Sequence, residues 1–135
     1  MSTPSLPRST LVELFFEAVE THRGRVALQR MVSERALEDI TYEQVLATVK
    51  LVTAALLEHG IERGDRVAIL SENRPEWALA DYGCLCAGAW DVPVYATLTA
   101  PQVAYLFQDS GAKLVFASNE EEMTKALEAA SQAGP

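Results

Sequence analysis

The fold is decided by residues 66–118, which read RVAILSENRPEWALADYGCLCAGAWDVPVYATLTAPQVAYLFQDSGAKLVFAS. Three short apolar runs, at 67–70, 92–95 and 114–117, are each bounded by polar or turn residues, a pattern typical of buried strands. The spacers between them are too long for hairpin turns and long enough for crossover helices, which predicts parallel strands. We therefore predict a β-α-β-α-β unit of a doubly wound sheet. A binding site would lie at the carboxyl ends of its strands.

Two helices and a hairpin are predicted before this unit. Thr10 and Thr41 each open a capping box that Glu13 and Gln44 complete. Between these helices, two apolar runs flank a polar stretch and predict an antiparallel hairpin. The predicted fold class is thus α/β, a partial doubly wound, mainly parallel sheet with flanking helices and a small antiparallel hairpin near the N-terminus. Residues 1–9 are expected to form a flexible arm.

Helix starts and buried faces are also predicted within and around the unit. Asn73 is expected to cap the helix after the first strand, and Pro93 is expected at a strand start, a bulge or the edge of the sheet. Helical periodicity assigns several apolar residues to buried faces of the first and last helices. These are Leu11, Leu14, Phe15, Ala18 and Val19 in the first, and Met123, Ala126, Leu127 and Ala130 in the last.

Composition narrows the classes of function. The 135-residue chain has the length of one domain and a net charge of −8, whereas nucleic-acid binding normally requires a basic face. The sequence contains no run of about 18 apolar residues, so we predict no transmembrane helix. The N-terminus also lacks the apolar core of a signal peptide. We therefore expect a cytoplasmic protein that does not bind nucleic acid.

The segment from Arg74 to Ala87 is predicted to be a helix with almost no polar face. A helix of this kind is normally buried on several sides. One face of a sheet covers only part of it, and an uncovered remainder would be a large apolar patch. We therefore expect self-association, or packing against a missing remainder of the protein, through this helix.

No catalytic motif is present in the sequence. It contains no GxxxxGK[ST], GxGxxG, GxSxG, HExxH or CxxC pattern. Cys84 and Cys86 lie two residues apart in a helix and do not face each other, so we predict neither a disulfide nor a metal site. The loops at the predicted strand ends offer hydrogen-bonding groups, but no acid–base pair or activated nucleophile. We predict no catalytic residue.

The chain also shares several short motifs with a known enzyme family. The shared motifs are Thr41-Tyr42, Gly64-Asp65-Arg66-Val67, Ser71-Glu72-Asn73-Arg74-Pro75-Glu76-Trp77, Val92-Pro93-Val94-Tyr95 and Asp109-Ser110-Gly111-Ala112-Lys113. In this order and spacing, about residues 10–130 resemble the N-terminal part of the adenylate-forming (AMP-binding) enzymes. The likeness is strongest to the long-chain fatty acid–CoA ligases, or acyl-CoA synthetases.

The resemblance implies a fatty-acid-activating enzyme. Such enzymes form an acyl-adenylate from a fatty acid and ATP with Mg²⁺ and then transfer the acyl group to coenzyme A. Their phosphate loop and catalytic lysine lie downstream of the matching part, so the chain alone is expected to be inert and to bind none of these cofactors. The loop that approaches the coenzyme A side corresponds to Tyr95, Ala96, Thr97 and Thr99.

A different class of function stays open on the sequence. A stand-alone α/β binding or regulatory module, receiver-like or flavodoxin-like, has the same alternation of strands and helices. A receiver requires acidic residues at the strand ends, and a flavodoxin-like module requires a phosphate loop. Neither pattern is met in this chain, which favours the ligase hypothesis.

Overall fold

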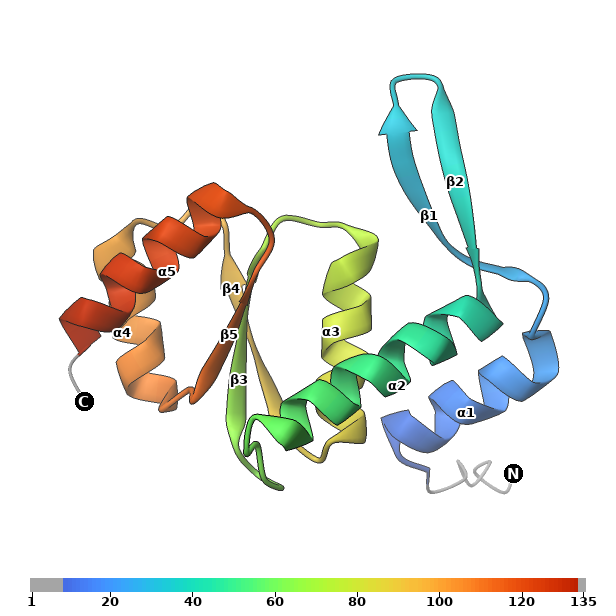
Figure 1. Cartoon of the computed structure of the whole chain (residues 1–135), viewed down its shortest axis with the longest axis horizontal. Coiled ribbons are helices and arrows are strands. Elements are labelled where there is room, and N and C mark those ends of the chain that lie inside the picture. Colours follow the sequence, from blue (N-terminus) through green and yellow to red (C-terminus); the bar gives the residue numbers. More distant parts are fainter. Residues whose placement is uncertain (1–8, 134–135) are drawn as a thin grey trace, which may run out of the picture.

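The computed structural model describes residues 9–133, which form five helices and five strands (Figure 1). In chain order these are α1 (Leu11–His22), β1 (Val26–Ser33), β2 (Ala36–Thr41), α2 (Tyr42–Glu58), β3 (Arg66–Ser71), α3 (Pro75–Cys86), β4 (Trp90–Tyr95), α4 (Ala100–Ser110), β5 (Leu114–Ala117) and α5 (Glu120–Ala133). The three predicted strands and the predicted hairpin are confirmed. Burial is confirmed only for β3, because Val94 is the one buried residue of β4 and the residues of β5 are half-buried. Of the predicted arm, only Ser9 belongs to the described residues.

The central sheet is parallel and has the order β4-β3-β5. Val67 of β3 lies between Asp91 of β4 and Leu114 of β5. Pro93 stands within β4, which is an edge strand and pairs only with β3 among the described strands. Proline is tolerated in an edge strand because its missing N–H does not break hydrogen bonds to strands on both sides. One of the three positions predicted for this proline is therefore confirmed.

Helices cover both faces of this sheet (Figure 1). On one face, Ala68, Leu70 and Val94 pack against Val103 of α4 and Ala126 of α5. On the other face, a second cluster joins Val67 of β3 to α2 and α3 and contains Leu56, Ile61, Cys84 and Ala89. The four central residues of β3 are fully buried because both faces are covered, which explains their continuous apolar run.

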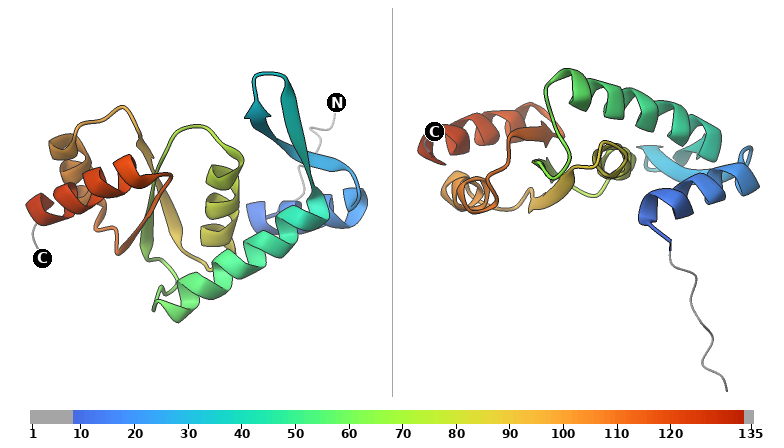
Figure 2. Two further views of the ribbon diagram at one scale, coloured as in Figure 1. Left: turned by 45° about the horizontal axis from the view of Figure 1, so that its top comes forward. Right: turned by 90° about the horizontal axis from the view of Figure 1, so that it is seen from below.

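A third cluster lies to one side of the sheet and joins α1, α2 and α3 to the base of the hairpin. Phe15 and Val19 of α1 meet Val45 and Val49 of α2 here, and the ring of Phe15 stacks on Tyr82 of α3 at 4.4 Å between centroids. Beyond this base, β1 and β2 project away from the rest of the chain (Figures 1 and 2). The distal half of the hairpin is exposed, including Met31, Val32 and Leu37.

The apolar helix is covered more completely than its sequence suggests. None of the residues of α3 is exposed, because α2 packs along it, α1 and the hairpin base pack against Leu79 and Tyr82 in its middle, and the sheet lies behind it. Thr53 of α2 donates a hydrogen bond of 3.2 Å to the carbonyl of Gly83 across the contact. The expectation that this chain lacks the elements to cover α3 is therefore wrong.

Two further expectations are corrected. Asn73 does not cap α3, because Arg74 occupies the N-cap position without a side-chain cap bond and Pro75 begins the helix. The predicted buried faces of α1 and α5 are also partly wrong, since five of their members are exposed. Leu11, Leu14, Leu127 and Met123 are exposed, as is the small Ala130, while Glu122, Ala126 and Ala129 are the buried residues of α5.

The capping boxes are confirmed and allow a first prediction. The Oγ1 of Thr41 accepts from the N–H of Gln44 at 3.3 Å, and the N–H of Thr41 donates to Oε1 of Gln44 at 2.8 Å. Thr41→Ala is expected to lower the free energy of unfolding by ~1 kcal/mol, because the orphan N–H at the start of α2 loses its acceptor. Urea denaturation measures this loss. Thr124→Ala, inside α5, is the control and should be neutral, so equal losses would contradict the prediction.

Candidate functional site

The carboxyl ends of the three parallel strands lie at one edge of the sheet. β3 ends at Ser71, β4 at Tyr95 and β5 at Ala117, and the loops after them meet there. Open α/β sheets bind ligands at this edge, since the connecting loops leave it in different directions. The candidate site is therefore built from the loops that follow β3, β4 and β5.

A cavity of about 480 Å³ opens between the first two of these loops. Its lining residues are Ser71, Glu72, Asn73, Trp77, Pro93, Val94, Tyr95, Ala96 and Thr97. Three of the four residues predicted for the coenzyme A side are thus brought together. The fourth, Thr99, does not line the cavity, because its hydroxyl and its N–H both donate to Gln102 at the start of α4.

A lysine side chain of α5 fixes the backbone of the loop after β4. Lys125 donates a hydrogen bond of 2.5 Å to the carbonyl of Ala96 and pairs with the buried Glu122 at 2.9 Å. The side chains of Tyr95 and Thr97 are exposed, with 77% of Tyr95 accessible. The loop therefore offers a fixed backbone and freely accessible side chains to the cavity.

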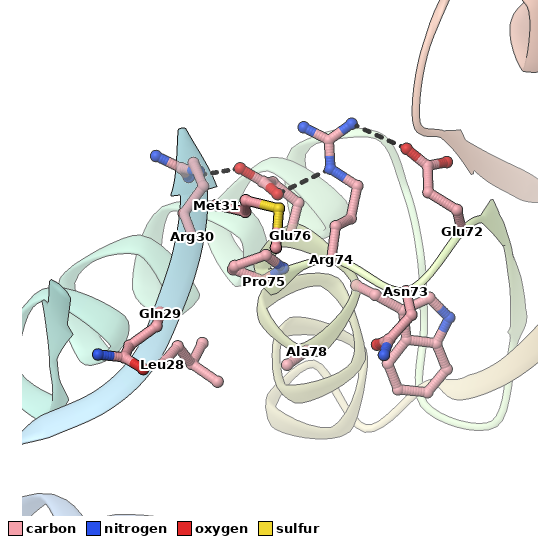
Figure 3. A pocket seen from close by; sticks show the side chains of 11 residues that line it. Leu28, Gln29, Arg30, Met31, Glu72, Asn73, Arg74, Pro75, Glu76 and Ala78 are labelled. Atoms are coloured by element: carbon pink, nitrogen blue, oxygen red, sulfur yellow. Dashed lines mark hydrogen bonds and ion pairs between the residues drawn. The ribbon is translucent and has the colours of Figure 1, made fainter. Parts of the chain in front are cut away.

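A chain of charged side chains connects this edge to the hairpin (Figure 3). Arg74 donates to Glu76 at 2.8 Å and to the carbonyl of Ser118 at 3.0 Å, while Ser118 donates to Glu72 at 2.5 Å. Arg30 of the hairpin pairs with the same Glu76. The carboxylate of Glu76 therefore joins the hairpin to the loop after β3, and Arg74 joins that loop to the end of β5.

These contacts shift the pKa values of the acidic residues. The hydrogen bond from Arg74 is the main reason that the pKa of Glu76 falls to about 2. The hydrogen bond from Ser118 lowers the pKa of Glu72 below its usual range. Both carboxylates are therefore ionised at neutral pH and are engaged in ion pairs or hydrogen bonds, so neither is available as a general acid.

Glu76→Gln is expected to lower the free energy of unfolding by about 0.5–1 kcal/mol at neutral pH, because these ion pairs remain partly exposed. The depressed pKa means that the contribution of Glu76 is present above pH ~4.5 and is lost as the pH falls towards 2. Hydrogen exchange of the hairpin amides should accelerate in the variant. Glu34→Gln, in the hairpin turn, is the control; hairpin exchange that is unchanged in Glu76→Gln would contradict the role of Glu76.

A second cavity of about 500 Å³ lies between the hairpin and the start of α3 (Figure 3). It shares Glu72, Asn73 and Trp77 with the first cavity. Sequence reasoning counted Trp77 only as part of an apolar helix and considered Asn73 mainly as a cap. Asn73 follows the end of β3 by two residues and Trp77 lies in the first turn of α3, so proximity to the carboxyl end of β3 was the signal that could have assigned both to the site.

The arrangement excludes several kinds of chemistry. Burial, with Asp91 and Asp81 nearby, raises the pKa of Cys84 to about 12, so its thiol is not an activated nucleophile at neutral pH. Among residues 9–133, no group of three or more His, Cys, Asp or Glu side chains could hold a metal ion. Arg74, next in sequence to Asn73 of the first cavity, is paired with Glu72 and Glu76.

Comparison with known proteins gives the family of this chain. Residues 15–134 match the family model described as AMP-binding enzyme. The chain belongs to the AMP-binding enzyme family. This family assignment confirms the resemblance found in the sequence.

Three similar proteins show which part of an AMP-binding enzyme the chain represents. The long-chain-fatty-acid–CoA ligase FadD15 of Mycobacterium tuberculosis is 33% identical over 115 residues, which are 85% of this chain and 19% of that ligase. The uncharacterized protein Rv1549 of the same organism is 32% identical over 120 residues, 89% of this chain and 66% of that protein. The crystal structure of the N-terminal domain of FACL13 from M. tuberculosis matches with a TM-score of 0.73 at 30% identity, covering 92% of this chain and 30% of that domain.

The chain therefore spans about a fifth of the length of FadD15 and corresponds to the N-terminal region of AMP-binding ligases. Within residues 9–133, no helix has both the length and the apolar character needed to cross a bilayer.

Proposed function

We propose that this chain is the N-terminal scaffold of a fatty acid–CoA ligase and carries no catalytic activity by itself. The whole enzyme would join a fatty acid to AMP at the expense of ATP, with Mg²⁺, and would then transfer the acyl group to coenzyme A. The observation that carries this proposal is the match of residues 15–134 to AMP-binding enzymes, in a sequence without a phosphate loop.

Inertness follows from the chemistry of the strand-end loops. The acidic and basic side chains at the carboxyl edge are paired with one another, and the first cavity is lined mainly by apolar and neutral polar groups. Adenylate formation requires groups that stabilise charge on the transferred phosphate. These groups would have to come from residues outside this chain.

Activity and binding measurements test this prediction. Titration of MgATP and palmitate into the chain is expected to release no heat of binding, and exchange of labelled pyrophosphate into ATP should be absent. Full-length FadD15 serves as the positive control under the same conditions. Binding of MgATP with a dissociation constant below ~100 μM, or formation of palmitoyl-adenylate, would refute the proposal.

We propose further that Tyr95, Ala96, Thr97 and Thr99 form a wall on the coenzyme A side of the ligase. The exposed side chains and the fixed carbonyl of Ala96 support this role, whereas Thr99 contributes by shaping the start of α4. Because the chain alone is expected not to bind coenzyme A, the test uses the whole ligase, in which Tyr95→Ala and Thr97→Ala should raise the KM for coenzyme A at least threefold and leave the KM for ATP unchanged. An unchanged KM for coenzyme A in both variants would refute the assignment. A cytoplasmic location of the enzyme remains a prediction.

A further inference from the structure

The loop after β4 begins with a tight turn. The N–H of Leu98 donates to the carbonyl of Tyr95 at 3.1 Å, which closes a four-residue turn over residues 95–98. In such a turn, the peptide unit between the second and third residues takes no part in the closing hydrogen bond. Here this central peptide unit consists of the carbonyl of Ala96 and the N–H of Thr97. Its orientation therefore depends on contacts from outside the turn and on the backbone of Thr97.

A buried ion pair on α5 sets the orientation of this peptide unit. Lys125 donates to the carbonyl of Ala96 at 2.5 Å and pairs with Glu122 at 2.9 Å, and only 7% of the Glu122 side chain is accessible. The buried carboxylate holds the ammonium group in place through a charge-assisted hydrogen bond. A reversed peptide unit would also give Thr97 a positive φ, which β-branched residues avoid and which no non-glycine residue of the described chain adopts.

The same orientation directs the N–H of Thr97 to the first cavity. The carbonyl and the N–H of a trans peptide unit point in opposite directions, and the described residues contain no cis peptide bond. α5 covers one face of the sheet, whereas α3, which lines the cavity through Trp77, covers the other (Figure 1). The N–H therefore points away from α5, to the side on which the cavity opens. It has no hydrogen-bond acceptor among residues 9–133 and is available to a ligand.

The lining of the cavity indicates the chemistry of the acceptor. Glu72 is the one charged side chain among the lining residues, and it is ionised at neutral pH. A negatively charged group of a ligand would be repelled there. An uncharged carbonyl oxygen, as in an amide, accepts from the N–H without this repulsion. The remaining walls suit an uncharged ligand segment, since they are largely apolar or aromatic and include Trp77, Pro93, Val94 and Tyr95.

We propose that the backbone N–H of Thr97 donates to an uncharged carbonyl oxygen of the ligand, and that Lys125, held by Glu122, is the positioning residue for this donor. The inference rests on the proposed function, in which coenzyme A is the ligand on this side. The ammonium group also polarises the peptide unit, because a charged donor on a carbonyl strengthens the hydrogen bond that the N–H of the same unit makes. α5 thus contributes to the site although none of its residues lines the cavity.

Removal of the N–H alone tests the donor. In the whole ligase, the amide of Thr97 is exchanged for an ester by incorporating the α-hydroxy acid analogue of threonine. This exchange should raise the KM for coenzyme A about fivefold and leave kcat and the KM for ATP unchanged, because one hydrogen bond to the ligand is lost. The same exchange at Thr48 in α2 is the control and should leave both KM values unchanged. A Thr97 ester with an unchanged KM for coenzyme A would overturn the donor role.

Removal of the ammonium group tests the positioning role. Lys125→Met alone would leave a buried carboxylate unpaired, so the variant is the neutral double substitution Glu122→Gln, Lys125→Met. The double variant should raise the KM for coenzyme A at least about threefold with kcat unchanged, because the donor is no longer held in place. Lys125→Arg keeps the charge and the donors, and its KM should stay within about twofold of the wild-type value.

NMR spectroscopy of the isolated chain reports the contact without any ligand. The double variant should shift the carbonyl carbon signal of Ala96 and the amide nitrogen signal of Thr97, which belong to one peptide unit. The matched control is Asp65→Asn, Lys113→Met, which removes an ion pair of 2.7 Å at the amino ends of β3 and β5. This control should change neither these two signals nor the KM for coenzyme A.

The outcomes separate this inference from the proposed function. Unchanged signals of residues 96 and 97 in the double variant would overturn the positioning role. A KM for ATP that rises as much as the KM for coenzyme A would overturn it too, because the substitution would then loosen the whole site. A whole wild-type ligase that forms no acyl-CoA would instead refute the proposed function, and with it the ligand named here.

Discussion

Gly83→Ala is expected to lower the free energy of unfolding by about 2–3 kcal/mol. Gly83 lies in α3 where α2 passes closest, and a Cβ atom placed there would be 2.3 Å from Cγ1 and 2.9 Å from Cβ of Val52. Rotation of the Val52 side chain moves Cγ1 but not Cβ, so the two helices would have to separate. The helix propensity gained by alanine, about 1 kcal/mol, offsets only part of this cost.

Urea denaturation of a double-mutant cycle distinguishes a steric cause from other effects of the substitution. In a Val52→Ala background, Gly83→Ala should cost at least ~1 kcal/mol less than in the wild type, because the contact with Cγ1 at 2.3 Å is gone and only the contact with Cβ at 2.9 Å remains. Gly24→Ala is the control, since no heavy atom lies within 4 Å of a Cβ at that position and its backbone conformation suits any residue. Equal losses for Gly83→Ala in both backgrounds would show that contact with Val52 is not the cause.

Asp81→Asn is expected to stabilise the protein at pH 7 by about 1–2 kcal/mol. Burial, together with the nearby carboxylate of Asp91, raises the pKa of Asp81 from 3.8 to about 6. The folded state therefore holds a proton that the unfolded state releases at lower pH. The full shift corresponds to about 3 kcal/mol, and the remaining solvent exposure of Asp81 reduces the expected gain.

The raised pKa of Asp81 also predicts how the free energy of unfolding changes with pH. Because the pKa of Asp81 is raised in the folded state, the stabilisation from its protonation is complete below pH ~3.8 and is lost as the pH rises through about 6. Asp81→Asn should remove the decrease in the free energy of unfolding between pH 4 and 7, and Asp91→Asn should make that decrease smaller. Thermal denaturation at several pH values measures the profile, with Asp109→Asn on the surface of α4 as the control. A variant that is less stable than wild type at pH 7 would show that the two carboxylates do not repel each other.

Local signals in the sequence predicted most of the secondary structure. The capping boxes at Thr10 and Thr41 act within four residues, so neighbours in sequence are enough to recognise them. The apolar run of β3 is equally local, because a strand buried on both faces has no polar alternation. The exact ends of the helices were harder to predict from the sequence. Asn73 was predicted to cap α3, but Arg74 occupies the N-cap position and Pro75 begins the helix.

The candidate site was only partly predictable. Its loop after β4 was identified through resemblance to a family, and its position at the strand ends followed from the parallel topology. The link from Arg30 to Glu76 joins residues 46 positions apart, and Arg74 reaches Ser118 across 44 positions. No local pattern encodes such pairs, since they depend on where the hairpin and the three strands come together.

The amino-acid sequence alone determined the order of strands and helices, the parallel unit and the resemblance to the AMP-binding enzyme family, because each follows from local periodicity, caps and motifs. Only the tertiary structure decided which apolar surfaces stay open. It covers α3 with α2 at Gly83 and turns Met123 and Leu127 of α5 outward. The physical reason is that burial depends on which elements pack against a face, whereas periodicity shows only that a face is apolar.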